Sequence, residues 1–226
     1  MFDSFKAFYS SYLHHPLLLF VGPTLLLFLL VPRLRYLRGY LVAFAIISLV
    51  DALVTGPLIA WTQLSGPPKT FVVVLFVILG DLRYFMLVEH FVGSEGARSR
   101  ARELGVALAL SLVVPLAAAI PIATNMLVAL RHIFLCYEVM FLVFALVLRL
   151  LVLPRRLARG GADEGTRRWL LLVTHFVIAH YALWAISDVT ILGGYDAGYA
   201  LRLVPNLMYY GAFLPYVYLT SPRELR

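Results

Sequence analysis

The chain has 226 residues, 62% of which are hydrophobic, and its mean hydropathy is +0.89. Soluble globular domains are about 45–50% apolar, so this composition excludes a small soluble domain and indicates that the lipid bilayer solvates most of the chain. The formal net charge of +7 lies in arginines of short loops, which does not favour nucleic-acid binding, and the single cysteine, Cys136, excludes a disulfide within the chain.

A membrane-spanning helix needs about 20 mostly apolar residues. In the fourth apolar segment of this chain, Pro115 and Pro121 are expected to break the helix. We predict an all-α polytopic membrane protein in which residues 1–226 form a single domain with seven transmembrane helices. The seven predicted spans are 16–31, 40–62, 70–92, 104–125, 129–153, 168–192 and 200–220.

Lysine and arginine are distributed unequally over the two ends of these spans. Thirteen of them fall on one side, and the other side has Lys6, Lys69, Arg131 and Arg202. Because cytoplasmic loops carry the excess of positive charge, we predict an N-terminus outside the cell, a cytoplasmic C-terminus and a multi-pass location in the cell membrane. Arg83 is the one arginine expected deep within a span, where it should form a structural ion pair with a carboxylate of a neighbouring helix.

Three spans carry an ionisable side chain close to their midpoint. These residues are Asp51 in the second span, Asp81 in the third and His180 in the sixth. A charge at the bilayer centre costs at least ~3 kcal/mol on insertion scales, so such residues face the interior of a helix bundle and mark functional sites. We predict that the three residues are catalytic. Asp51 and Asp81 are expected to act as the acid and the base, and His180 as a base, an orienting group or a metal ligand.

The third span contains the sequence GDLRYFMLVEHF at positions 80–91, in which polar groups point to every side of the helix. We therefore expect a central helix that faces lipid on no broad side. Asp81 should face a cavity, while Glu89 and His90 should lie near the inner interface, where solvation is easier.

The carboxylates expected in the spans outnumber the cations. The spans contain four carboxylates, Asp51, Asp81, Glu138 and Asp188. The only side chain expected deep in a span that always carries a positive charge is Arg83. Protonation of some carboxyl groups, an imidazolium or a metal ion would restore the balance.

Further polar and aromatic residues are predicted to line a substrate pocket open toward the outer leaflet. Thr55 shares a helix face with Asp51, and Trp184 shares one with His180, because each pair is separated by four residues. The predicted substrate-binding residues are Thr55, Glu138, Trp184, Asp188, Asn206 and Tyr210.

These features favour a membrane enzyme that acts on a lipophilic substrate, either a lipid or an isoprenoid, by isomerisation, cyclisation or hydrolysis. Two alternatives remain open: a proton- or ion-coupled transporter, and a haem-binding or sensor anchor that uses His90 and His175. A retinal pigment is excluded, because no lysine follows Lys69 to form a Schiff base. Membrane lipids are expected partners, whereas the sequence identifies no cofactor, no protein metal ligand and no oligomeric state.

Overall fold

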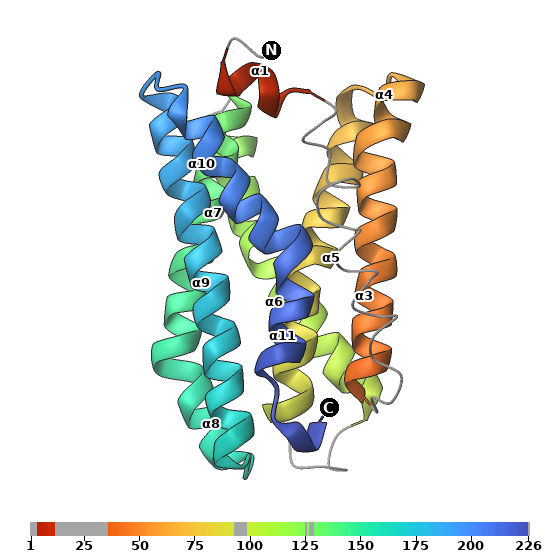
Figure 1. Ribbon diagram of the computed structural model, residues 1–226, viewed down its shortest axis with the longest axis vertical. Helices are drawn as coiled ribbons and strands as arrows, with labels where there is room; N and C mark the ends of the chain where they lie inside the picture. The colour runs from red at the N-terminus through yellow and green to blue at the C-terminus, as the bar shows by residue number, and fades with distance from the viewer. Residues whose placement is uncertain (1–3, 12–35, 93–98, 125, 127–128, 226) are drawn as a thin grey trace. The chain divides into compact units, whose positions relative to one another are not determined.

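The computed structural model describes residues 4–11, 36–92, 99–124, 126 and 129–225, and within these ranges every regular element is a helix (Figure 1). The predicted first span, 16–31, lies outside the described residues. The helices are α1 Phe5–Tyr9, α3 Tyr36–Leu53, α4 Ile59–Thr62, α5 Gly66–Val92, α6 Arg100–Ala123, α7 Leu130–Val147, α8 Leu153–Arg159, α9 Glu164–Leu192, α10 Ala197–Asn206 and α11 Phe213–Thr220, followed by a 3-10 turn at Arg223–Leu225.

Among the described residues, four helical stretches are long and apolar enough to cross a membrane: Pro68–Val92, Arg100–Ala123, Arg131–Arg159 and Glu164–Leu192. They coincide with the third to sixth predicted spans and are compatible with a multi-pass membrane protein. The second and seventh predicted spans fall on helical stretches that π-helical turns divide into shorter pieces. The all-helical class is thus confirmed for the described residues, whereas the total of seven spans and the orientation remain predictions.

The prolines act differently from the sequence-based expectation. Helix α6 runs through Pro115 and ends two residues after Pro121, so the expected break in the fourth span is wrong. A proline removes one backbone hydrogen bond, and inside a membrane bundle neighbouring groups and small local adjustments can compensate for that loss.

Three π-helical turns accompany other prolines. They span Val54–Leu58, Leu148–Val152 and Leu207–Ala212. The first turn contains Pro57. Each of the other two contains the residue four positions before a later proline. Because proline has no N–H group, the carbonyl of that residue lacks its usual hydrogen-bond donor. Single π turns of this kind are frequent at functional sites.

The chain forms two compact units. The central unit comprises residues 77–182, and the terminal unit comprises residues 1–76 together with 183–226. The long helices α5 and α9 each run from one unit into the other. Within the terminal unit, α1 packs on α10 (Figure 1), and α11 contacts α3.

The end of α8 approaches α5 so closely that only glycine fits. A Cβ atom added at Gly160 would overlap the carbonyl oxygen of Val92 at the end of α5, whereas one added at Gly105 in α6 would meet no atom within 4 Å. We expect Gly160→Ala to lower the free energy of unfolding by about 1–3 kcal/mol, because backbone must move to relieve the overlap. Gly105→Ala should instead stabilise the protein by about 0.5–1 kcal/mol. Thermal unfolding in detergent would check both, and equal effects of the two substitutions would contradict the close approach.

Asp163 precedes α9 and accepts a hydrogen bond from the backbone N–H of Thr166 at 2.9 Å. Hydrogen bonds from the side chain and backbone of Thr166 hold the pKa of the Asp163 carboxyl below its ordinary value of 3.8. The stabilisation is therefore complete above pH 3.8 and is lost as the pH falls through the lower pKa of the folded protein.

We expect Asp163→Ala to cost about 1 kcal/mol of stability at neutral pH and almost nothing in strong acid. Denaturant titrations at several pH values would measure this difference. Asp163→Asn is the control, since an asparagine keeps the hydrogen bond to Thr166 without the titration. A cost of Asp163→Ala that does not change with pH would contradict this account.

Candidate functional site

Asp81 is the centre of a hydrogen-bonded cluster in the central unit. It lies on α5 and is only 3% exposed. Its Oδ1 atom accepts a hydrogen bond from the hydroxyl of Tyr181 on α9 at 2.6 Å, and its Oδ2 atom accepts one from Tyr137 on α7. An O–H···O distance of 2.6 Å is typical of a hydrogen bond that involves a carboxylate. Three helices therefore place two phenol donors on the two oxygens of one buried carboxyl group.

Further aromatic rings pack beside the tyrosines that bind this carboxyl group. The ring of Tyr181 stacks on Phe141 with centroids 4.1 Å apart, and Phe85 lies 6.1 Å from Phe141. Such rings exclude water and offer negative faces to a positive charge. The cluster thus combines an ionisable group with a water-poor, aromatic environment.

His180 belongs to the same cluster through Tyr181. The imidazole is buried, and its ring centroid lies 4.5 Å from that of Tyr181. Its Nδ1 atom is 3.3 Å from the carbonyl oxygen of Phe176. Because a carbonyl oxygen can only accept, this contact favours the tautomer with the proton on Nδ1, and Nε2 is then the basic nitrogen. Asp81 and His180, both predicted from the sequence, therefore contact one common tyrosine.

Asp51 lies in the terminal unit, where it contacts Thr55. The Thr55 hydroxyl is 2.7 Å from the backbone oxygen of Asp51 and 3.1 Å from its carboxylate Oδ1. Thr55 belongs to the π turn Val54–Leu58. The structure thus pairs Asp51 with Thr55, as their spacing predicts, and groups Asp81 with His180.

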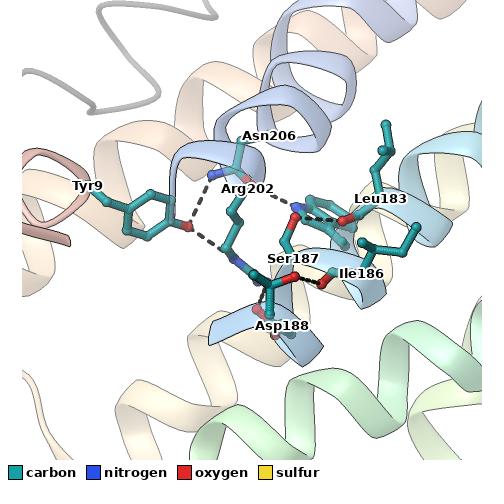
Figure 2. A network of polar contacts seen from close by, with 9 residues as sticks. Tyr9, Leu183, Ile186, Ser187, Asp188, Arg202 and Asn206 are labelled. Atoms are coloured by element: carbon teal, nitrogen blue, oxygen red, sulfur yellow. Dashed lines mark hydrogen bonds and ion pairs between the residues drawn. The ribbon is translucent and has the colours of Figure 1, made fainter. Parts of the chain in front are cut away.

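Three of the predicted substrate-binding residues meet in a second polar cluster of the terminal unit (Figure 2). The indole nitrogen of Trp184 donates to Oδ1 of Asn206 at 2.7 Å. Asp188 forms an ion pair with Arg202 of α10, and Tyr9 of α1 contacts both Arg202 and Asn206. Tyr210 lies beside this cluster through Tyr209, whose ring contacts both Trp184 and Tyr210.

The ion pair of Asp188 corrects the expected charge balance. Arg202 lies near the outer end of the predicted span 200–220 and was counted with the outer side, and it is only 9% exposed within α10. Among the described residues, Arg202 is thus a buried arginine in addition to Arg83, and it pairs with one of the four carboxylates. Arg202 lies in the middle of α10 and its long guanidinium side chain reaches a carboxylate of another helix, which counting charges on each side of the spans does not reveal.

Glu138 and Arg83 are both buried in the central unit, on α7 and α5 respectively. Glu138 follows Tyr137 directly, and Arg83 lies two residues after Asp81. The ion pair predicted for Arg83 and the substrate contact predicted for Glu138 stay predictions.

Glu89 differs from its expected solvated position. It is 0% exposed, and its two oxygens accept hydrogen bonds from Arg156 of α8 at 2.5 and 2.7 Å. The neighbouring His90 contacts Glu103 at the start of α6 at 3.2 Å. The end of α5 is therefore covered by α6 and α8, and a bidentate ion pair replaces the expected solvation.

The two histidines considered for haem also have side-chain partners. His90 contacts Glu103, and Nε2 of His175 accepts a hydrogen bond from Arg149 at 3.0 Å. In the part of the chain that the structure describes, no group of three or more His, Cys, Asp or Glu side chains could hold a metal ion.

The tyrosine partners in these clusters were not among the residues predicted from the sequence. Tyr137 and Tyr181 lie within helices and not near their ends, where an interfacial belt would place them. A buried tyrosine hydroxyl usually finds a partner, so a tyrosine in mid-span next to an ionisable residue was the available signal. Tyr9 and Arg202 gave no such signal, because their contacts join residues 193 positions apart.

No family model matches the chain, and no curated protein or solved structure is significantly similar to it.

Proposed function

We propose that this chain is an integral membrane enzyme that uses buried acid–base groups to transform a lipophilic substrate, a lipid or an isoprenoid. The observation that carries the proposal is the Asp81 carboxyl group, which is buried among aromatic rings and hydrogen-bonded on both oxygens to Tyr137 and Tyr181. A carboxyl group held in this way can deliver a proton to a substrate that water does not reach.

The arrangement fits proton-driven isomerisation or cyclisation best. In such a reaction a protonated Asp81 gives its proton to one alkene carbon, and the cation that forms lies against the faces of Tyr181 and Phe141. His180, through Nε2, takes a proton from a neighbouring carbon. After the product leaves, His180 releases this proton to water and Asp81 takes one up from water through the Tyr181 hydroxyl, which restores the starting state. No proton is gained or lost overall.

The other predicted roles complete this proposal. Asp51 is proposed as a second acid or base of the enzyme. The proposed substrate-binding residues are Thr55, Glu138, Trp184, Asp188, Asn206 and Tyr210.

We further propose seven transmembrane helices in the cell membrane, with the N-terminus outside and the C-terminus in the cytoplasm. The four long apolar helices and the helical stretches on either side of two π turns support this arrangement. A reporter that is active only in the cytoplasm should be active when it is fused after Arg226, and a reporter that is active only outside the cell should be inactive there. Activity of an external reporter at that position would overturn the orientation.

The experiment for the enzymatic proposal does not require a known substrate. The detergent-purified protein is incubated in deuterated water with a total lipid extract of the expression host, and apolar products are analysed by mass spectrometry. Isomerisation or cyclisation places deuterium on carbon, whereas hydrolysis places it only on exchangeable oxygen.

Asp81→Asn, which keeps the size of the side chain, serves as the matched control in this experiment. Deuterium on carbon with the wild-type protein and none with Asp81→Asn would support the proposal. Equal incorporation with both proteins, or none with either, would contradict catalysis at Asp81. In the latter case, proton flux in vesicles would test the transporter alternative, and an absorption spectrum of the same sample would test the haem anchor.

A further inference from the structure

The terminal unit contains a second arrangement in which polar groups converge on one atom. The hydroxyl oxygen of Tyr9 accepts hydrogen bonds from Nε of Arg202 and from Nδ2 of Asn206, each at 3.1 Å (Figure 2). Both donors are buried and lie four residues apart on α10, so they share one face of that helix. Two donors from one helix thus bind a single oxygen supplied by a distant part of the chain.

These donors are oriented by partners that do not belong to α1. The indole nitrogen of Trp184 can only donate, and it donates to Oδ1 of Asn206 at 2.7 Å. The amide nitrogen of Asn206 must therefore face Tyr9. Asp188 holds the guanidinium of Arg202 through Nη1, which leaves Nε directed at Tyr9. The donor pair is consequently positioned by α9 and α10 and does not need Tyr9 to set its direction.

The charges of this cluster select the kind of oxygen that fits. Asp188 balances the charge of Arg202, while Asn206, Trp184 and Tyr9 are neutral. An added anion would leave the buried cluster with an uncompensated negative charge, which is costly. A neutral hydroxyl oxygen is therefore the preferred occupant, as the phenol of Tyr9 already illustrates.

Helix α1 is attached to the rest of the terminal unit by contacts that can open. It has only five residues, none of them fully buried. The carboxylate of Asp196 accepts hydrogen bonds from the backbone N–H groups of Phe5 at 2.7 Å and Lys6 at 2.9 Å, both at the surface. A helix this short is unstable by itself, and solvent-exposed hydrogen bonds stabilise it weakly.

We propose that Arg202 and Asn206 form a binding site for the hydroxyl of a neutral alcohol or phenol with an apolar body, and that Tyr9 occupies this site when the ligand is absent. The proposal rests on the substrate-binding role proposed above for Asn206 and names the chemistry of the bound group. The ligand competes with Tyr9, so its apparent affinity depends on the fraction of molecules in which α1 has moved away.

The test measures binding alone, so its outcome is independent of the deuterium experiment. Tritiated 4-octylphenol, whose head group copies the side chain of Tyr9, is bound to the detergent-purified full chain in a scintillation-proximity assay. Octylbenzene, which lacks the hydroxyl, and 4-octylbenzoate, which is an anion, serve as competitors at the same detergent concentration.

We expect Tyr9→Ala to bind 4-octylphenol about tenfold more tightly than the wild-type protein, because the competing hydroxyl is gone. Asp196→Ala should also tighten binding, since it loosens α1 but leaves Tyr9 and both donors in place. Adding Asn206→Leu to either variant should remove the gain, and octylbenzene should compete about 100-fold less well than the unlabelled phenol.

Three results would overturn the proposal. The first is equal affinity of the wild-type protein and Asp196→Ala, a result that can be obtained even if Tyr9→Ala does not fold. The second is competition by octylbenzene as strong as that by the phenol, which would show that the site binds apolar groups without recognising a hydroxyl. The third is stronger competition by 4-octylbenzoate than by the phenol, which would reject a neutral ligand.

Discussion

Replacement of Arg156 by methionine is expected to lower the free energy of unfolding by about 3–5 kcal/mol. Glu89 is 0% exposed and accepts hydrogen bonds of 2.5 and 2.7 Å from this guanidinium. Without Arg156 the buried carboxylate would lose these two charge-assisted hydrogen bonds. Because the Arg156 side chain is itself 28% exposed, some water can reach the site, and the lower part of this range is expected.

The neighbouring Arg155 provides a matched control, since it is exposed and carries the same charge. Arg155→Met should change the stability by less than about 0.5 kcal/mol. The double variant Glu89→Leu, Arg156→Met should recover most of the loss, because a well-packed apolar pair can replace a buried ion pair. Denaturant titration in a fixed detergent would compare the variants, and similar losses for Arg155→Met and Arg156→Met would contradict a specific role of the pair.

This ion pair also illustrates how far the sequence predicts the fold. The hydrophobic segments predict the helices α5, α6, α7 and α9 well, because length and apolar composition are properties of a single segment. The burial of Glu89 depends on where α8 packs, and that packing requires the absence of a side chain at Gly160. A contact of this kind joins positions more than 60 residues apart and leaves no periodic signal in the sequence.

The prolines show a similar limit. Pro115 and Pro121 resemble helix breakers in isolation, yet α6 contains both. The propensity of proline to end a helix is measured in water, where a freed carbonyl can bind solvent and the chain can turn away. Within an apolar bundle the remaining backbone hydrogen bonds are harder to give up, so the helix continues.

The candidate site was partly predictable for an energetic reason. Ionisable residues inside apolar segments are costly, so Asp51, Asp81 and His180 could be selected without any structure. Their partners could not be selected in the same way, because a tyrosine such as Tyr137 or Tyr181 is compatible with both lipid and protein surroundings. The residues that balance a buried charge are thus harder to predict than the charge itself.

The largest functional effect is expected for the group at the centre of the site. Asp81→Asn should lower the deuterium-transfer activity by about 10²–10⁴-fold, since general acid–base catalysis by one positioned group contributes a factor of this size. The amide oxygen can still accept a hydrogen bond from one of the two tyrosines, and its NH2 group can donate to the hydroxyl oxygen of the other. The fold should therefore persist, but the amide cannot deliver a proton at a useful rate. The measurement is the rate of deuterium incorporation per mole of folded protein.

Tyr181→Phe and Tyr137→Phe separate the relay of protons from the positioning of Asp81. Tyr181 contacts both Asp81 and His180, so its hydroxyl is the one expected to move a proton, and its loss should cost about 10–100-fold in rate. Tyr137 orients only the other carboxyl oxygen, so Tyr137→Phe should cost less.

Tyr84→Phe is the matched control for these two variants, because Tyr84 lies on the same helix as Asp81 and is also buried. Its hydroxyl contacts Thr174 at 3.0 Å and no residue of the Asp81 cluster. Loss of this hydroxyl should cost about 1 kcal/mol of stability and leave the rate unchanged. If Tyr84→Phe reduced the rate as much as Tyr181→Phe, activity would simply follow stability, and the hydrogen bonds to Asp81 would be structural. If only the variants at Asp81, Tyr137 and Tyr181 lost activity, the burial of Asp81 would be explained by its chemistry, since packing alone would favour an apolar residue there.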